Sequence, residues 1–184
     1  MEPDSARSTP PTFHTVGHGT LGADEFVALL RGAGIEAVVD IRSHPGSRHV
    51  PHFSRDMGIW LGADGIDYSW ERRLGGRRRL DAESIDTALT HPAFRAYAAH
   101  MRTDEFAAGL AAVIADATER PTVIMCSESV WWRCHRRMVA DAAVLLHGVA
   151  VAHLMHDGSV RPHPPWDVAR VDGDHLVYDV DPAP

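Results

Sequence analysis

The residue types most capable of chemistry gather where three apolar runs of the sequence end. These residues are His18, Asp40, Arg42, Ser43, Cys126 and Glu128. Because side chains alternate along a strand, Asp40 and Arg42 share one face, as do Cys126 and Glu128. Each residue alone has an ordinary structural explanation, such as capping a helix. Chance would scatter such a set, so we interpret it as one functional site.

Segment 126–137, Cys-Ser-Glu-Ser-Val-Trp-Trp-Arg-Cys-His-Arg-Arg, runs from the end of an expected strand into an expected helix. Free N–H groups at a helix start favour an anion and lower the pKa of a thiol. Trp131 and Trp132 offer stacking surface beside Arg133 and Arg136, a combination that holds single-stranded or flipped nucleic acid. Packing of a tryptophan against the sheet is the alternative.

The elements that must position these residues alternate along the chain. We expect strands at 13–19, 35–41, 66–70, 122–126 and 149–155. We expect helices at 24–34, 54–60, 106–117 and 131–147, with a further helical region from His91 to Met101. The best strands are continuous apolar runs, which predicts an α/β fold: a single domain with a mainly parallel, Rossmann-like sheet between helices on both faces. Ligands of such sheets bind at the carboxyl ends of the strands.

Length and composition fit one domain of 184 residues with a formal net charge of −7. We expect a flexible segment over 1–12, the α/β domain over 13–158, and a C-terminal extension over 159–184. Leu176-Val177-Tyr178 of that extension is a candidate edge strand. The sequence shows neither a signal peptide nor a membrane span, which predicts a cytoplasmic protein whose two cysteines are not a disulfide framework.

The charge argues against coating of duplex nucleic acid by bulk attraction, although a local basic patch stays possible. All cationic side chains are arginine, since the chain has no lysine. A lysine Schiff-base mechanism is therefore excluded, whereas bidentate binding of phosphate or carboxylate is available.

Six short pieces of the chain form an ordered set of motifs: Thr15–Thr20 (TVGHGT), Val39–Pro45 (VDIRSHP), Leu74-Gly75-Gly76, Cys126-Ser127-Glu128, Arg133-Cys134-His135-Arg136 and then His153. In these motifs and their order the sequence resembles the domain of unknown function 488 family. They cover about residues 13–158. The resemblance implies the α/β fold and a shared site, and loosely associates the chain with the handling of damaged or modified bases. Trp131-Trp132 stands where the family usually has more varied, often acidic residues.

The leading hypothesis is a DNA glycosylase-like enzyme that hydrolyses the N-glycosidic bond of a damaged or modified base in nucleic acid. Its oxocarbenium-like transition state needs a carboxylate, and the departing base needs a proton donor. The expected catalytic residues are Asp40, Glu128, His18 and His135. The expected substrate-binding residues are Arg42, Ser43, Tyr68, Gly75, Gly76, Cys126, Trp131, Trp132, Arg133 and Arg136.

Three alternatives stay open. The first is thiol chemistry on a small molecule, with Cys126 as nucleophile and His18 or His135 as base. The second is a module that binds a modified base without catalysis. The third, a zinc site, is disfavoured because Cys134 and His135, if adjacent on a helix, would diverge by about 100°. We therefore expect no metal, and no other cofactor is indicated. We also expect no membrane partner and either a monomer or a homodimer.

Overall fold

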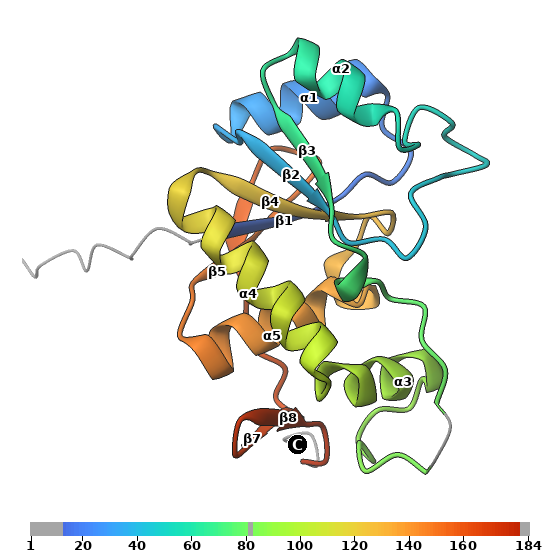
Figure 1. Ribbon diagram of the computed structural model, residues 1–184, viewed down its shortest axis with the longest axis vertical. Helices are drawn as coiled ribbons and strands as arrows, with labels where there is room; N and C mark the ends of the chain where they lie inside the picture. The colour runs from blue at the N-terminus through green and yellow to red at the C-terminus, as the bar shows by residue number, and fades with distance from the viewer. Residues whose placement is uncertain (1–12, 81–82, 181–184) are drawn as a thin grey trace, which may run out of the picture.

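The computed structural model describes residues 13–80 and 83–180 (Figure 1). The flexible segment expected over 1–12 lies outside these residues. The expected α/β fold is confirmed. Six strands form one sheet in the order β3-β2-β4-β1-β5-β6, in which only β6 runs antiparallel to its neighbour. The strands are β1 (Phe13–Gly17), β2 (Ala37–Asp40), β3 (Asp67–Trp70), β4 (Thr122–Cys126), β5 (Val151–Leu154) and β6 (Val160–Pro162).

Helices cover both faces of the sheet and make the three-layer arrangement predicted from the apolar strands. Helices α1 (Ala23–Gly32) and α2 (Met57–Ala63) lie on one face, and α4 (Asp104–Glu119) and α5 (Arg136–His147) lie on the other (Figure 1). Helix α3 (Pro92–Met101) precedes α4. Strands β1, β2 and β4 are almost wholly buried, as expected of a parallel sheet covered on both sides.

Two apolar cores hold the layers together. Phe26 and Leu30 of α1 pack with Phe53 and Met57 against one face of the sheet. Helices α4 and α5 fill the other core, which includes Leu110. Burial of this apolar surface is the main stabilising contribution, and it fixes the strands whose ends carry the polar residues.

The C-terminal extension joins the domain in a way that differs from the sequence expectation. The edge strand is β6, not Leu176–Tyr178. Leu176 and Val177 instead belong to β8 (His175–Val177), which pairs with β7 (Arg170–Asp172) in a separate two-stranded sheet. Leu176 and Tyr178 are buried in the same core as α5, so apolar burial, rather than strand pairing with the main sheet, explains this run.

The expected helix over 131–147 is divided in two. Residues Trp131–Arg133 form a single 3-10 turn, η2, Cys134 is extended (φ −121°, ψ 148°), and α5 begins at Arg136. The apolar spacing of 131–134 is satisfied equally by a 3-10 turn, so periodicity did not reveal the break. Within the described residues, no helix has the length and apolar character needed to cross a membrane.

Candidate functional site

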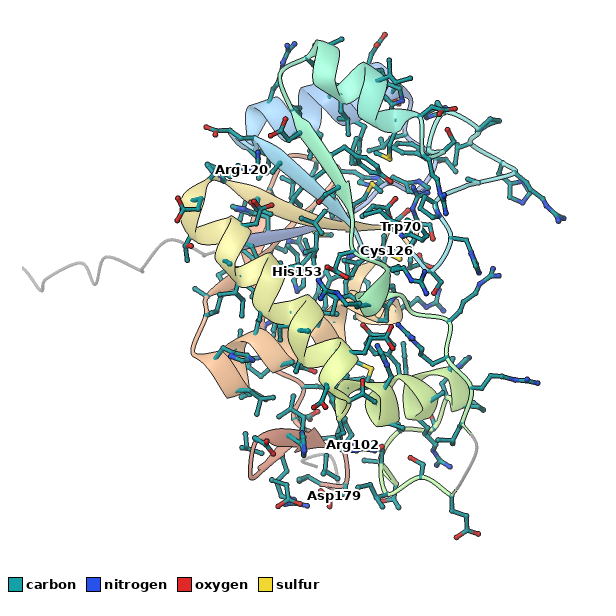
Figure 2. All side chains as sticks on the ribbon, in the orientation of Figure 1. Trp70, Arg102, Arg120, Cys126, His153 and Asp179 are labelled. Atoms are coloured by element: carbon teal, nitrogen blue, oxygen red, sulfur yellow. The ribbon has the colours of Figure 1, made fainter. Side chains whose placement is uncertain are left out.

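A cavity of about 880 Å³ opens at the carboxyl ends of β2 and β4. Figure 2 shows Cys126 and Trp70, the last residues of β4 and β3, at the carboxyl ends of the strands. Arg120, which precedes β4, lies toward the opposite ends of the strands. The cavity lies where the rule for parallel sheets places a ligand. Its lining includes these residues predicted from the sequence: Arg42, Ser43, Gly76, Cys126, Glu128, Arg133 and His135.

Two thiols and one imidazole form a cluster in the cavity wall. Nδ1 of His135 lies 3.8 Å from Sγ of Cys126 and 3.6 Å from Sγ of Cys134. Both cysteines are free and buried. We call Cys126, Cys134 and His135 the CCH cluster. The extended backbone at Cys134 allows this arrangement, because adjacent residues of a regular helix would diverge. The sequence argument against convergence of Cys134 and His135 was therefore wrong.

The orientation of the His135 ring is fixed by its surroundings. Its Nε2–H donates to the backbone carbonyl of Ile41 at 3.1 Å, which leaves the lone pair of Nδ1 directed to the two sulfurs. The ring of Tyr97 packs edge-on against it, with 5.0 Å between centroids. A Cβ at Gly76 would lie 2.5 Å from Nδ1 of His135, so only glycine fits beside the ring.

The two thiols differ in pKa. A hydrogen bond from Cys134, together with His135 and the positive charge of Arg136, holds the pKa of Cys126 well below its usual range against the opposing effect of burial. Burial raises the pKa of Cys134, and its neighbour Cys126 raises it further. The surroundings of Cys126 therefore favour its thiolate form more than those of Cys134 do. The cluster can act as a nucleophile with its base or as a donor set for a soft metal ion.

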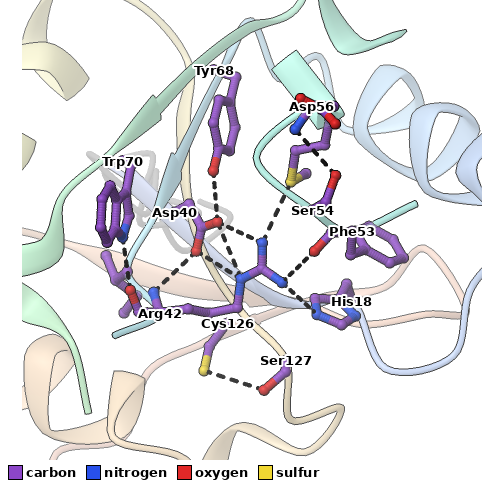
Figure 3. Close-up of polar contacts among 12 residues, drawn as sticks. His18, Asp40, Arg42, Phe53, Ser54, Asp56, Tyr68, Trp70, Cys126 and Ser127 are labelled. Atoms are coloured by element: carbon purple, nitrogen blue, oxygen red, sulfur yellow. Dashed lines mark hydrogen bonds and ion pairs between the residues drawn. The ribbon is translucent and has the colours of Figure 1, made fainter. Parts of the chain in front are cut away.

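Asp40 belongs to a buried network behind the cavity (Figure 3). Its carboxylate accepts hydrogen bonds from Nε and Nη2 of Arg42, the latter at 2.6 Å, and from the hydroxyl of Tyr68 at 2.8 Å. Burial and the charge of Asp40 raise the pKa of Tyr68. Asp40 is fully buried and does not line the cavity, whereas Arg42 does. The observed contacts of Asp40 and Tyr68 thus orient Arg42.

His18 lies in the same network, outside the cavity lining. Its Nδ1–H donates to the carbonyl of Gly19 at 2.9 Å, and its Nε2 accepts from Nη1 of Arg42 at 3.3 Å. The ring stacks on Phe53 with centroids 4.0 Å apart. Burial, and then the charge of Arg42, lower the pKa of His18 to about 4. His18 is therefore neutral near pH 7 and acts here as a hydrogen-bond acceptor for Arg42.

Arg136 holds the loop that carries Glu128. Its guanidinium donates to the backbone carbonyls of Glu128 and Ser129 and is 2 % exposed. Gly17 permits this packing, since a Cβ there would lie 1.8 Å from the carbonyl oxygen of Glu128. The Glu128 side chain is exposed and lines the cavity. Arg136 thus positions the loop, and Glu128 faces the space where a ligand would sit.

The two tryptophans do not line the cavity. Trp131 stacks on His153 of β5 with centroids 4.1 Å apart and planes 5° from parallel. Trp132 packs edge-on against Trp131 and is 44 % exposed. The packing alternative therefore describes Trp131. Phe94 and Tyr97 of α3 supply the aromatic surface of the cavity instead.

The wall of the cavity is basic although the chain is acidic. Arg48, Arg77 and Arg133 line it, and Glu128 is the single acidic residue among the described lining residues. No carboxylate of the described residues lies within ion-pair distance of these three arginines, whereas Arg42 is paired with Asp40. Gly75 lies just outside the lining and packs against Ser43, where a Cβ would come within 2.7 Å of Oγ.

Sequence reasoning missed Arg48, Phe94 and Tyr97, and did not count Cys134 among the site residues. The loop after β2 and helix α3 have no motif that points to the cavity, so only the fold brings them there. The motif of Cys126 followed by Cys134-His135 is visible in the sequence. A regular helix over 131–147 would direct Cys134 and His135 apart, and this expectation left Cys134 out of the site.

A comparison with protein families matches residues 22–143, more than half of the chain, to the family described as "Domain of unknown function DUF488". The chain belongs to the DUF488 family. The matched part of DUF488 contains the VDIRSHP and Cys-Ser-Glu motifs and the CCH cluster, whereas the GHG motif at 17–19 and His153 lie outside it. Neither a curated protein nor a solved structure shows significant similarity to the chain.

Proposed function

We propose that this DUF488 protein is a cytoplasmic enzyme that hydrolyses the N-glycosidic bond of a modified or damaged base in nucleic acid. One observation supports the proposal above others. A single cavity combines Arg48, Arg77 and Arg133 with the carboxylate of Glu128, in a chain whose net charge is −7. Arginines without described carboxylate partners are suited to phosphate, and the volume of the cavity suits one nucleotide.

Glu128 is the carboxylate to which we assign the chemistry. Loss of the base leaves positive charge on the sugar, and a carboxylate on one face stabilises that charge or accepts a proton from the attacking water. The bond from C1′ to the base nitrogen breaks as a bond from water oxygen to C1′ forms. Arg48, Arg77 and Arg133 hold phosphates, and Phe94 offers a face on which the base stacks.

Asp40 takes a different role in this proposal from the one the sequence suggested. Its oxygens already bond Arg42 and Tyr68, so it is a positioning residue that fixes Arg42 in the wall of the cavity. His18 supports Arg42 from the other side. The loss of either residue would therefore act through Arg42.

Thiol catalysis is a second candidate, favoured by the contact between Cys126 and His135. Sγ of Cys126 lies 3.8 Å from Nδ1, whose lone pair is fixed toward it by the bond from Nε2 to Ile41. That is the arrangement of a nucleophile and its base. This candidate requires a covalent adduct on Cys126 during turnover.

The test is the formation of abasic sites in labelled oligonucleotides that carry a panel of modified bases, both single- and double-stranded. Alkali-dependent strand breaks are expected with the wild type and with Glu36→Gln, a control that changes an exposed carboxylate ahead of β2. Glu128→Gln should reduce the rate by about 100-fold or more. Equal rates in both variants, or no abasic sites on any substrate, would refute the proposal.

A covalent adduct on Cys126 separates the two candidates. Base hydrolysis by water forms no adduct on the enzyme, whereas thiol catalysis adds the mass of a substrate fragment to Cys126 during turnover. Mass spectrometry of the intact chain, quenched in the presence of substrate, therefore decides between them.

A further inference from the structure

The CCH cluster has the composition of a metal site that keeps one position open. Two thiolates and an imidazole are the donors preferred by zinc-class ions, and magnesium and calcium prefer oxygen. Catalytic zinc sites use three protein ligands and leave the fourth position to water or substrate. Cys126, Cys134 and His135 supply three ligand atoms, and all three residues line the cavity.

The distances fit such an ion. Zinc lies about 2.3 Å from sulfur and about 2.0–2.1 Å from nitrogen, so a tetrahedral site has S···N edges of about 3.5 Å. The observed S···N distances are 3.8 Å for Cys126 and 3.6 Å for Cys134. All three ligand atoms lie within 4.8 Å of one another. The two S···N edges therefore need to shorten by only about 0.1–0.3 Å to reach the tetrahedral value.

The surroundings of His135 match those of a metal ligand. A ligating histidine almost always donates its other ring N–H to a carbonyl or carboxylate, which fixes the tautomer. Here Nε2–H of His135 donates to the carbonyl of Ile41, so Nδ1 presents its lone pair to the position between the sulfurs. The absence of a side chain at Gly76 keeps space beside Nδ1, which a Cβ would occupy at 2.5 Å.

We propose that the CCH cluster binds one zinc-class ion through Sγ of Cys126, Sγ of Cys134 and Nδ1 of His135, with the open position facing the arginine-lined cavity. The charges balance, because two thiolates and a divalent ion sum to zero. The ion would therefore leave the positive charge of the arginine wall available to an anionic substrate.

This site deepens the proposed function, on which its catalytic meaning rests. Zinc lowers the pKa of a bound water to about 7, which makes hydroxide available at neutral pH. Glu128, two residues after Cys126 and in the same lining, would take the proton of that water and return it to the departing base. Zinc deaminases use a zinc-bound water beside a glutamate that is not a ligand to attack a ring carbon of the base, so the same pair of groups can deliver water to a nucleoside.

Metal content tests the site independently of activity. The full chain, reduced and freed of metal, is dialysed with zinc and analysed for bound metal, and cobalt is used for its sulfur-to-metal charge-transfer band. We expect one ion per chain in the wild type and in His49→Gln, a control at another histidine of the cavity wall. Zinc binding should weaken by more than about 100-fold in each of the three ligand variants, Cys126→Ser, Cys134→Ser and His135→Gln. That loss exceeds the loss of about 10- to 100-fold typical of changes to residues that only support the ligands.

A measurement on the wild type alone guards against variants that fail to fold. Zinc should protect both thiols from alkylation, and a chelator should restore their reactivity. A reduced chain that binds no zinc, or ligand variants that bind it as the wild type does, would overturn the site. Metal binding without base removal refutes only the proposed function, and base removal by a metal-free chain refutes only the catalytic role of the bound ion.

Discussion

Removing the charge of Asp40 should destabilise the protein strongly, because it leaves Arg42 buried without its partner. The two side chains are 0 % and 5 % exposed and lie 2.6 Å apart. Breaking a buried pair by removing one partner costs about 3–5 kcal/mol. Domains of this kind have about 5–15 kcal/mol of stability in total, so Asp40→Asn would remove a large share of it.

The matched control is Asp64→Asn, which makes the same chemical change in a surface pair. Asp64 lies 2.8 Å from Arg31, and these side chains are 34 % and 58 % exposed. Surface pairs contribute about 0–1 kcal/mol. With a urea dependence of about 2 kcal/mol per molar, the midpoint of unfolding should fall by about 2 M for Asp40→Asn and by less than about 0.5 M for Asp64→Asn.

Urea titration followed by circular dichroism measures both midpoints. Equal small shifts would refute the argument, because they would mean that Arg42 finds water or another acceptor when the charge of Asp40 is lost.

Two further predictions concern histidines. Burial, and then the charges of His163, Arg136 and Arg137, lower the pKa of His153 to about 3. Between about pH 6.5 and 3 the unfolded chain therefore binds a proton that the folded chain does not, so the free energy of unfolding should decrease as the pH is lowered, by up to about 1.4 kcal/mol per pH unit. His153→Gln should flatten this dependence in urea titrations from about pH 7 to 4. An unchanged slope would contradict the prediction. The second prediction concerns Gly76→Ala, which places a Cβ 2.5 Å from Nδ1 of His135. The imidazole of His135 must then move by about 1 Å, which is more than the geometry of a metal ligand tolerates. This substitution should lower zinc affinity at least about tenfold, whereas Gly46→Ala, in the same cavity with open space around its Cβ, should bind zinc as the wild type does; equal affinities would contradict this geometry.

The fold was predictable because its strands are continuous apolar runs separated by amphipathic segments. That pattern determined the parallel sheet, its covering helices and the edge where the ends of β2 and β4 meet. Strand alternation also placed Asp40 with Arg42 correctly on one face. It could not show that Arg42 would bond back to Asp40 and so separate this carboxylate from the cavity.

The cluster itself could not be predicted from periodicity. The convergence of Cys134 and His135 depends on one extended residue between η2 and α5, and the spacing of apolar residues is compatible with an unbroken helix. The aromatic surface of the cavity was unpredictable for a similar reason: the sequence suggested Trp131, and the structure has Phe94 there instead. Both lie beside the site in sequence or fold, and only tertiary packing decides that Trp131 stacks on His153 while Phe94 faces the cavity.

The central claim is that an anionic, phosphate-bearing substrate binds in the arginine-lined cavity. Anisotropy titrations of a labelled single-stranded oligonucleotide over a range of salt concentrations test it most directly. Each phosphate contact contributes about 0.7 to the slope of log affinity against log salt for a single strand. Replacement of Arg48, Arg77 and Arg133 by glutamine should therefore reduce the magnitude of the slope by about 2.

The control replaces Arg31, Arg120 and Arg170, which pair with surface carboxylates away from the cavity, and changes the net charge by the same amount. The account predicts a wild-type slope for this control and a reduced slope for the cavity variant. Equal slopes in the two variants would show that binding follows overall charge rather than the cavity, and would contradict the account.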